Sequence, residues 1–194
     1  MKNLSLLFAL CLLVTVGANA QEFKKFKVGV GAGYAMPGGK GAKGGLLWTL
    51  EPSYRVSDAL AIGLRIEGAI LVRGFSEELG DDAEFDIAAI SSYTVNGNYY
   101  LNNNNFRPFV GAGLGIYSLA AVELKDSDNG GDAELSESES KFGFYPRIGF
   151  DAGHFTLALE YNLIPATKVD GLGGEFKNSY LGIRIGGFFG GGRK

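Results

Sequence analysis

The residue types that could bind a metal ion gather in one acidic stretch, residues 123–141. Its segment "DSDNGGDAELSE" places Asp126, Asp128 and Glu137 at the first, third and twelfth positions of a calcium loop, where carboxylates act as ligands. Gly130 stands at the fifth position and supplies no side-chain ligand. We therefore interpret the stretch as a solvated loop and predict no metal centre, with a weak divalent-cation site as the alternative.

Glycine-rich stretches are the second candidate, because the backbone amides of such loops can bind phosphate. The sequences "GVGAG" and "GAGLG" lack the helix that a dinucleotide-binding turn must open. In "GGKGAKGG", Gly41 stands where a phosphate-binding loop needs Ser or Thr. We therefore predict no nucleotide and no other cofactor.

Charged residues recur at every second position within otherwise apolar stretches. Between Leu60 and Arg73, for example, Arg65 and Glu67 alternate with large aliphatic residues. Buried charges need partners, so we predict an interior ion-pair network in which Arg65 and two other arginines answer three glutamates. The network that we predict contains Glu51, Arg55, Arg65, Glu67, Arg147, Glu160 and Arg184.

The elements that carry these charges have a period of two residues, and helical periodicity is missing from the chain after its N-terminus. The alternating stretches are 26–36, 46–56, 60–73, 85–101, 107–119, 142–151, 155–163 and 180–186. Most exceed the roughly 5–6 residues of an ordinary globular strand. They match the roughly 9–11 residues of a tilted strand that crosses a membrane.

The connections between these stretches alternate between long and short. The long ones are 37–45, 74–84, 121–141 and 165–177, and the short ones are 57–59, 102–105 and 152–154. Such unequal ends are typical of barrels with short periplasmic turns and long outer loops. Because hydrocarbon offers no hydrogen bonds, a spanning sheet must close and lose its edges. The sequence therefore predicts an all-β fold, an eight-stranded antiparallel up-and-down transmembrane β-barrel.

Three glycines in strict alternation, Gly111, Gly113 and Gly115, lie on the face that we assign to the lumen. A lumen of eight strands is just wide enough for side chains to fill. We therefore expect these glycines to leave room for large inward neighbours such as Tyr145, Arg147 or Arg184. Aromatic residues near the strand ends should form interfacial girdles: Trp48, Tyr54, Tyr99, Tyr100, Phe106, Phe155, Tyr161, Phe188 and Phe189.

Residues 1–20 have the features of a secretory signal peptide, with an early lysine, an apolar core and an A-x-A site that ends at Ala20. Cleavage there would leave one barrel domain over residues 21–194. Cys11, the single cysteine, lies in the signal, so we expect no disulfide in the mature chain. The net charge of −3 gives no basic footprint for nucleic acid.

The A-N-A site, "FKVGVGAGYAMPGG", "NYYLNNNNFRPFVGAGLGIYSL" and "YLGIRIGGFFGG" carry a resemblance that covers essentially the whole mature chain. The chain resembles the small eight-stranded outer-membrane β-barrel proteins, the OmpA-type transmembrane domain and its single-domain relatives. The resemblance implies a place in the cell outer membrane of a Gram-negative-type envelope. It also implies a monomer in contact with the lipid bilayer and lipopolysaccharide, inserted by the barrel-assembly machinery, with loops available to an extracellular ligand.

Members of this group serve as structural anchors, adhesins or narrow pores. Barrel esterases and deacylases of this size need a histidine beside a serine on the outer-leaflet side, and the single histidine, His154, lies in a predicted periplasmic turn. We therefore expect no enzyme and favour a structural or surface-interaction protein. A narrow channel or carrier for small or apolar solutes is the alternative, with a lateral opening between Ser91 and Gly97. A soluble lipocalin-like barrel with its apolar face inward is the third hypothesis.

Overall fold

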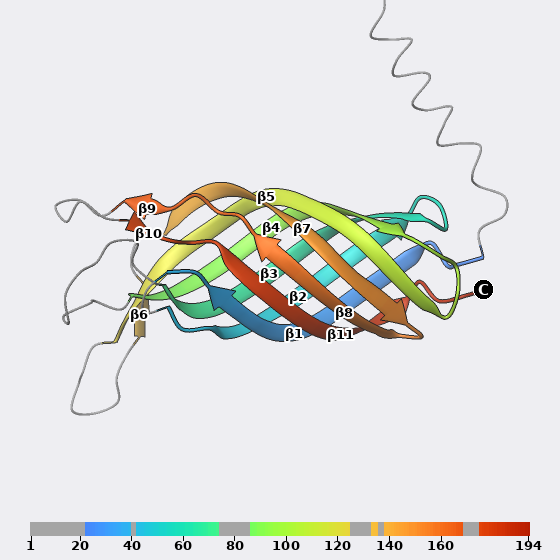
Figure 1. Cartoon of the computed structure of the whole chain (residues 1–194), viewed down its shortest axis with the longest axis horizontal. Coiled ribbons are helices and arrows are strands. Elements are labelled where there is room, and N and C mark those ends of the chain that lie inside the picture. Colours follow the sequence, from blue (N-terminus) through green and yellow to red (C-terminus); the bar gives the residue numbers. More distant parts are fainter. Residues whose placement is uncertain (1–21, 40–41, 74–85, 125–132, 136–137, 169–174) are drawn as a thin grey trace, which may run out of the picture.

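The computed structural model describes residues 22–39, 42–73, 86–124, 133–135, 138–168 and 175–194, which form strands and turns (Figure 1). The long strands are β1 (Phe26–Pro37), β2 (Gly45–Arg55), β3 (Leu60–Arg73), β4 (Asp86–Tyr100), β5 (Phe106–Leu124), β7 (Glu139–Ala152), β8 (Phe155–Asn162) and β11 (Tyr180–Gly190). The short strands are β6 (Ala133–Leu135), β9 (Thr167–Lys168) and β10 (Glu175–Phe176). No helix in the described part of the chain is long and apolar enough to cross a membrane.

The eight long strands close into a barrel, because each one is hydrogen-bonded to an antiparallel neighbour on both sides. The wall runs in the order β4, β3, β2, β1, β11, β8, β7 and β5, and the pairing of β4 with β5 completes the ring. The predicted all-β, eight-stranded antiparallel barrel is therefore confirmed. Strand β6 pairs with β5 beyond the wall, at the end where the long connections lie (Figure 1).

Three strands are several residues longer than the sequence predicts. Strand β5 continues to Leu124 because its last residues pair with β6, and β7 begins at Glu139 because that residue pairs with Leu119 of β5. Strand β11 continues to Gly190 because that residue pairs with Lys27 of β1. A strand ends where its backbone partners end, whereas the sequence pattern shows only where the apolar alternation ends.

The register of the pairs fixes the geometry of the barrel. The partners that follow Phe26 around the wall are Tyr54, Ile62, Gly97, Ala112, Pro146, Tyr161, Leu181 and finally Met36. Met36 lies on the starting strand, ten residues beyond Phe26. This offset over eight strands corresponds to a strand tilt of about 40°, which is visible as the oblique course of β5 and β11 (Figure 1).

Side chains alternate between the lumen and the outer wall along every long strand. On β3, Leu64 is 58% exposed whereas the neighbouring Arg65 is 0% exposed. Large apolar residues cover the outside and charged residues point inward. The hypothesis of a soluble lipocalin-like barrel is therefore wrong, since it requires the opposite orientation of both faces.

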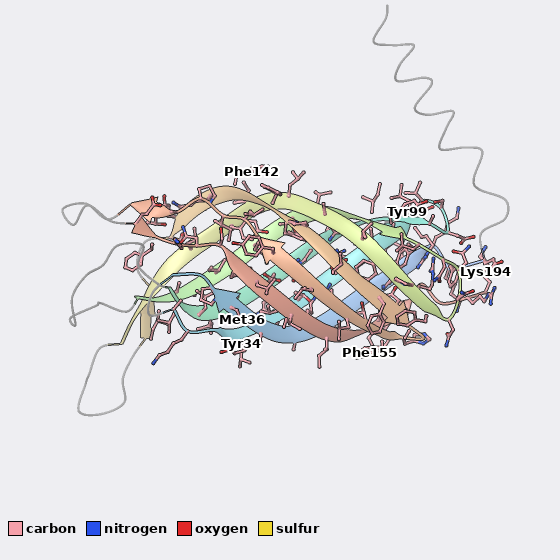
Figure 2. The ribbon with its side chains drawn as sticks, in the orientation of Figure 1. Tyr34, Met36, Tyr99, Phe142, Phe155 and Lys194 are labelled. Carbon is pink, nitrogen blue, oxygen red and sulfur yellow. The ribbon has the colours of Figure 1, made fainter. Side chains whose placement is uncertain are left out.

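Exposed aromatic side chains form two groups on the wall. Tyr99 and Phe155 lie near the short-turn end, and Tyr34 and Phe142 lie nearer the long connections (Figure 2). Of the residues predicted for girdles, seven are exposed: Trp48, Tyr54, Tyr99, Phe106, Phe155, Tyr161 and Phe189. The prediction was wrong for Tyr100 and Phe188, which are buried. Each follows or precedes an outward aromatic by one residue, so the strand alternation turns it into the lumen.

The alternating glycines of β5 make the lumen wide enough for large neighbours. A methyl group on Gly113 would overlap the ring of Tyr145. One on Gly111 would overlap the side-chain oxygen of Asn98 and the backbone oxygen of Gly97, and would press on Arg147. Gly115 instead lies against the backbone of β4 at Tyr93. The small inward face of β5 is therefore what admits the bulky inward residues of β7.

Gly113→Ala should destabilise the barrel by about 1–3 kcal/mol, because the added methyl group forces Tyr145 to move within a filled lumen. Gly29→Ala is the matched control, since a methyl group there would be 3.7 Å from the nearest atom, the backbone oxygen of Glu51. Unfolding followed by the change in gel mobility between folded and unfolded barrel measures both. Equal stability of the two variants would contradict the packing that we describe.

Candidate functional site

The first charged cluster in the lumen surrounds Arg65 of β3. Its two terminal nitrogens donate hydrogen bonds to the carboxylate oxygens of Glu160 on β8, at 2.8 and 2.6 Å. Arg65 also forms an ion pair with Glu67 on its own strand, and the hydroxyl of Tyr180 donates to Glu67. The guanidinium lies over the ring of Tyr145, 4.4 Å from its centre. One arginine thereby joins opposite walls of the barrel.

The second cluster surrounds Glu51 of β2. Arg147 of β7 donates two hydrogen bonds to its carboxylate, at 2.7 and 2.6 Å, and a third to the side-chain oxygen of Asn98 at 2.6 Å. Arg184 of β11 approaches the same carboxylate at 3.5 Å. A bidentate arginine–carboxylate pair is among the strongest polar contacts in proteins, so this cluster also joins distant strands.

The structure thus brings together six of the seven residues that we predict in the network, as two neighbouring clusters. Arg55, the seventh, lies nearer the short-turn end, where its nitrogens reach the backbone oxygens of Asp58 and Gly191 at 3.3 and 3.4 Å. Removal of one partner from a buried ion pair lowers stability strongly, because the other charge is left buried and unpaired. Replacement of both partners by apolar residues is often nearly neutral. The clusters therefore make the register of opposite walls sensitive to single substitutions.

A further charged pair was not included in the predicted network. Lys27 of β1 donates to the carboxylate of Asp151 on β7 at 2.5 Å, and the hydroxyl of Tyr100 donates to the same carboxylate at 2.9 Å. Both charged residues lie on the glycine-bearing face of their strands, and this position is the sequence feature that indicates an inward orientation. Nothing local in the sequence says that β1 and β7 approach each other across the lumen.

The end of the lumen near the long connections is apolar rather than charged. Buried residues from six long strands and from residue 164 pack into one cluster there: Ala35, Leu47, Ala69, Leu71, Ala88, Ile90, Tyr117, Leu119, Ile164 and Tyr180. The alternation of residues along the strands does not by itself separate this cluster from the polar interior. In the sequence, this cluster is indicated by large apolar residues at inward positions near the ends of the strands.

The opposite end of the lumen is covered by the segment that precedes β1. Phe23 is 6% exposed, and the guanidinium carbons of Arg107 and Arg55 lie 3.7 and 5.0 Å from its ring centre. The backbone N–H groups of Glu22 and Phe23 donate to the carboxylate of Asp58 at 3.0 and 3.3 Å. Phe23 therefore covers part of the mouth as an aromatic lid between two cations. A cavity of about 270 Å³, lined by Phe23, Arg107, Asp151 and Phe188, remains beside it.

Several predicted features lie elsewhere. Asp126, Asp128 and Glu137, the alternative cation site, fall outside the described residues, as does the predicted signal peptide of residues 1–20. Within the described residues, no group of His, Cys, Asp and Glu is arranged to hold a metal ion. His154 lies at the short-turn end, where its ring stacks on Phe188 at 5.5 Å.

The sequence matches the family model described as "Outer membrane protein beta-barrel domain" over residues 6–189. The chain belongs to this family. Among solved structures, this family barrel is similar to Neisserial surface protein A (NspA), with a TM-score of 0.53 and 18% identity over 84% of this chain and 94% of that one. It is also similar to OprG from Pseudomonas aeruginosa, with a TM-score of 0.50 and 15% identity over 88% of this chain and 98% of that one. The comparison with curated proteins found no match.

At these identities the solved structures support the fold of the family barrel and nothing finer. Membership of the family indicates what surrounds the outer wall, because the outer face of an outer-membrane barrel is exposed to the hydrocarbon of the bilayer. The exposed Leu64, Ile70, Leu114 and Ile148 are then in their expected environment.

Arg65→Met should lower the free energy of unfolding by about 3–5 kcal/mol, because it leaves the carboxylates of Glu67 and Glu160 buried without their cation. Adding Glu67→Gln and Glu160→Gln should restore part of the loss. Arg193→Ala is the control, since its pair with Glu22 is exposed and should contribute less than about 1 kcal/mol. Thermal unfolding in detergent measures all variants, and equal melting temperatures for Arg65→Met and the parent protein would refute the assignment.

Phe23→Ala should open the short-turn mouth of the lumen. Ser53→Cys, a near-isosteric change at an inward position that is 8% exposed, provides a thiol behind the lid. We expect that thiol to react with a water-soluble maleimide about tenfold faster in the Phe23→Ala background. The reaction then no longer requires a local opening of the segment that carries Phe23. Phe26→Ala, at an aromatic that is 63% exposed on the wall, should leave the rate unchanged. A lid with no role would give the same rate in all three backgrounds.

Proposed function

We propose that this protein is a non-conducting barrel of the outer membrane with a structural or surface-interaction role and no catalytic activity. The observation that carries the proposal is the filled lumen. An apolar cluster occupies one end, two ion-pair clusters occupy the middle, and Phe23 covers part of the other end. Arg65 and Arg147 each bind a glutamate within the lumen, which stabilises these charges without a passing ion.

The size of the remaining space supports a closed lumen. The cavity beside Glu51, Asn98 and Arg147 has a volume of about 20 Å³. About 10–15 Å³ on this measure is enough for a single water molecule. A hydrated ion or an organic solute is therefore too large for this gap, which lies beside the cluster around Glu51.

The arrangement of the ends supports a role at the cell surface. Lys194 lies at the end of the short turns, whereas β6, β9 and β10 lie at the opposite end (Figures 1 and 2). In outer-membrane barrels the short turns face the periplasm and the long loops face outward. We propose the same orientation here, as a monomer that contacts the bilayer and lipopolysaccharide, is inserted by the barrel-assembly machinery and presents its long connections to an extracellular ligand.

One observation favours the alternative of a carrier for small apolar solutes. A groove of about 510 Å³ lies on the outer wall and reaches Ser91, the first residue of the region where we expected a lateral opening. A carrier would need this groove to connect with the lumen. The buried Leu47, Ala69 and Ile90 lie behind it and belong to the apolar cluster, so the connection is filled by side chains.

Planar-bilayer recording tests the closed lumen. The parent barrel should show no stepwise conductance, because its charges are paired across the lumen. The double variant Glu51→Ala/Arg147→Ala removes the bidentate pair from the middle of the lumen and should also show no conductance, because the apolar cluster still fills one end, provided that its gel mobility shows a folded barrel. Stepwise conductance of the parent barrel would overturn the proposal. Uptake of an apolar dye by vesicles that contain the non-conducting parent would favour the carrier instead.

A further inference from the structure

The cavity beside the aromatic lid is a feature that a closed structural barrel does not require. Its volume is about 270 Å³, far more than the roughly 10–15 Å³ that a single water molecule needs. The exposed Asn103, Asn104 and Asn105 line it together with buried residues, so it opens to solvent at the end of the barrel where Lys194 lies (Figure 2). The cavity therefore has room for a small organic molecule that enters from this end.

Arg107, at the start of β5, is a buried cation in the lining of this cavity. It is 3% exposed. Its Nε donates to the backbone oxygen of Asn102 at 3.1 Å, and its Nη2 donates to the backbone oxygen of Asp58 at 2.6 Å and to the side-chain oxygen of Asn103 at 3.4 Å. These acceptors are all neutral. Within the described part of the chain, Nη1 has no hydrogen-bond partner and Arg107 forms no ion pair with a carboxylate.

The carboxylate best placed to neutralise Arg107 is bound by another cation. Asp151 is the direct partner of Arg107 in the pairing of β5 with β7. Its carboxylate is instead bound by Lys27 at 2.5 Å and by the hydroxyl of Tyr100 at 2.9 Å. The rings of Phe23 and Tyr100 lie 3.7 and 4.3 Å from the guanidinium carbon of Arg107, and they attract a cation without carrying a net charge. Arg107 is therefore a buried positive charge that lacks an anion.

Other walls of the cavity are aromatic. Phe23 and Phe188 both line it, and the ring of His154 stacks on Phe188 at 5.5 Å. Gly192 adds open space, because a methyl group there would be 3.8 Å from the nearest atom, Nε2 of His154. Aromatic side chains beside a cation suit a ligand that joins an apolar body to a negative charge.

We propose that this cavity is a binding site for a small organic acid with an apolar or aromatic body. The carboxylate of the ligand accepts a hydrogen bond from Nη1 of Arg107, and its body packs against the rings of Phe23 and Phe188. A carboxylate fits better than a neutral group, because it supplies the charge that Arg107 lacks. An organic body fits better than an inorganic ion, because the cavity is much larger than one ion and its walls are aromatic.

The inference goes beyond the proposed structural or surface role. In the orientation that we propose, the site opens to the periplasm. The ion-pair clusters around Arg65 and Glu51 occupy the lumen beyond it, so the cavity holds a ligand at one end and offers no passage to the other.

Calorimetric titration of the folded barrel in a zwitterionic detergent tests the proposal. Benzoate is the probe, and benzamide is the matched neutral ligand of the same shape. Benzoate should bind saturably, one molecule per barrel, and at least about tenfold more tightly than benzamide, because it alone neutralises Arg107. Inorganic phosphate should bind at least about tenfold more weakly than benzoate, since it leaves the aromatic walls without a contact.

Two variants change the site in different ways. Arg107→Gln removes the charge and keeps an N–H donor, so it should reduce the preference for benzoate over benzamide to less than about twofold. Gly192→Leu leaves Arg107 unchanged and fills space beside His154, so it should weaken benzoate binding at least about tenfold. Gly38→Leu is the matched control, because a side chain at this exposed glycine beyond β1 meets no atom within 4 Å. It should bind benzoate as the parent barrel does.

Four outcomes would overturn the proposal. The first is no saturable binding of benzoate to the parent barrel, and the second is equal binding of benzoate and benzamide. The third is unchanged benzoate binding in both Arg107→Gln and Gly192→Leu, which would place the ligand outside the cavity. The fourth is phosphate binding as tight as that of benzoate, which would mean an adventitious ion only. Gel mobility before and after boiling checks first that each variant is folded. None of these outcomes bears on the closed lumen, which the conductance recordings test separately.

Discussion

The lumen of an eight-stranded barrel is just wide enough for side chains to fill, so an inward charge must find a partner inside the barrel. In this chain the partners come from distant strands. Arg65 of β3 reaches Glu160 of β8, and Arg147 of β7 reaches Glu51 of β2. Each pair fixes how far one wall is shifted relative to the other. The register, the tilt and the ten-residue offset from Phe26 to Met36 are therefore consistent with the same polar contacts.

The structure of the outer wall follows from its contact with hydrocarbon rather than with charged groups. Hydrocarbon cannot satisfy a backbone N–H or C=O group, so the sheet must pair every strand on both sides. Large apolar residues then cover the outside, and small residues face inward where the lumen is crowded, as Gly113 does opposite Tyr145. A closed, filled barrel holds its strands in one register, and its long connections join the strands at one end. This division supports a protein that holds its loops at a surface rather than one that passes solutes through its centre.

Much of this architecture could be predicted from the sequence because it depends on local patterns. A period of two residues, eight stretches and alternating connection lengths are sufficient for the barrel and its two faces. The partners of particular charges could not be predicted, since they depend on which strands face each other across the lumen. Lys27 and Asp151 lie on the correct face, yet their contact appears only in three dimensions. Tyr100 and Phe188 show a second limit, because an aromatic beside a girdle residue has the opposite orientation. Phe23 lies before the first strand, where no alternation indicates that it covers the lumen.

The central claim is that charges paired across the lumen hold the barrel closed, and a double-mutant cycle at Glu51 and Arg147 tests it most directly. The free energy of unfolding is measured for the parent, for Glu51→Gln, for Arg147→Met and for the double variant. The account predicts a coupling energy of at least about 2 kcal/mol, because either single change leaves a buried group without its partner. Additive effects of the two substitutions would contradict it, since they would mean that the two side chains do not depend on each other.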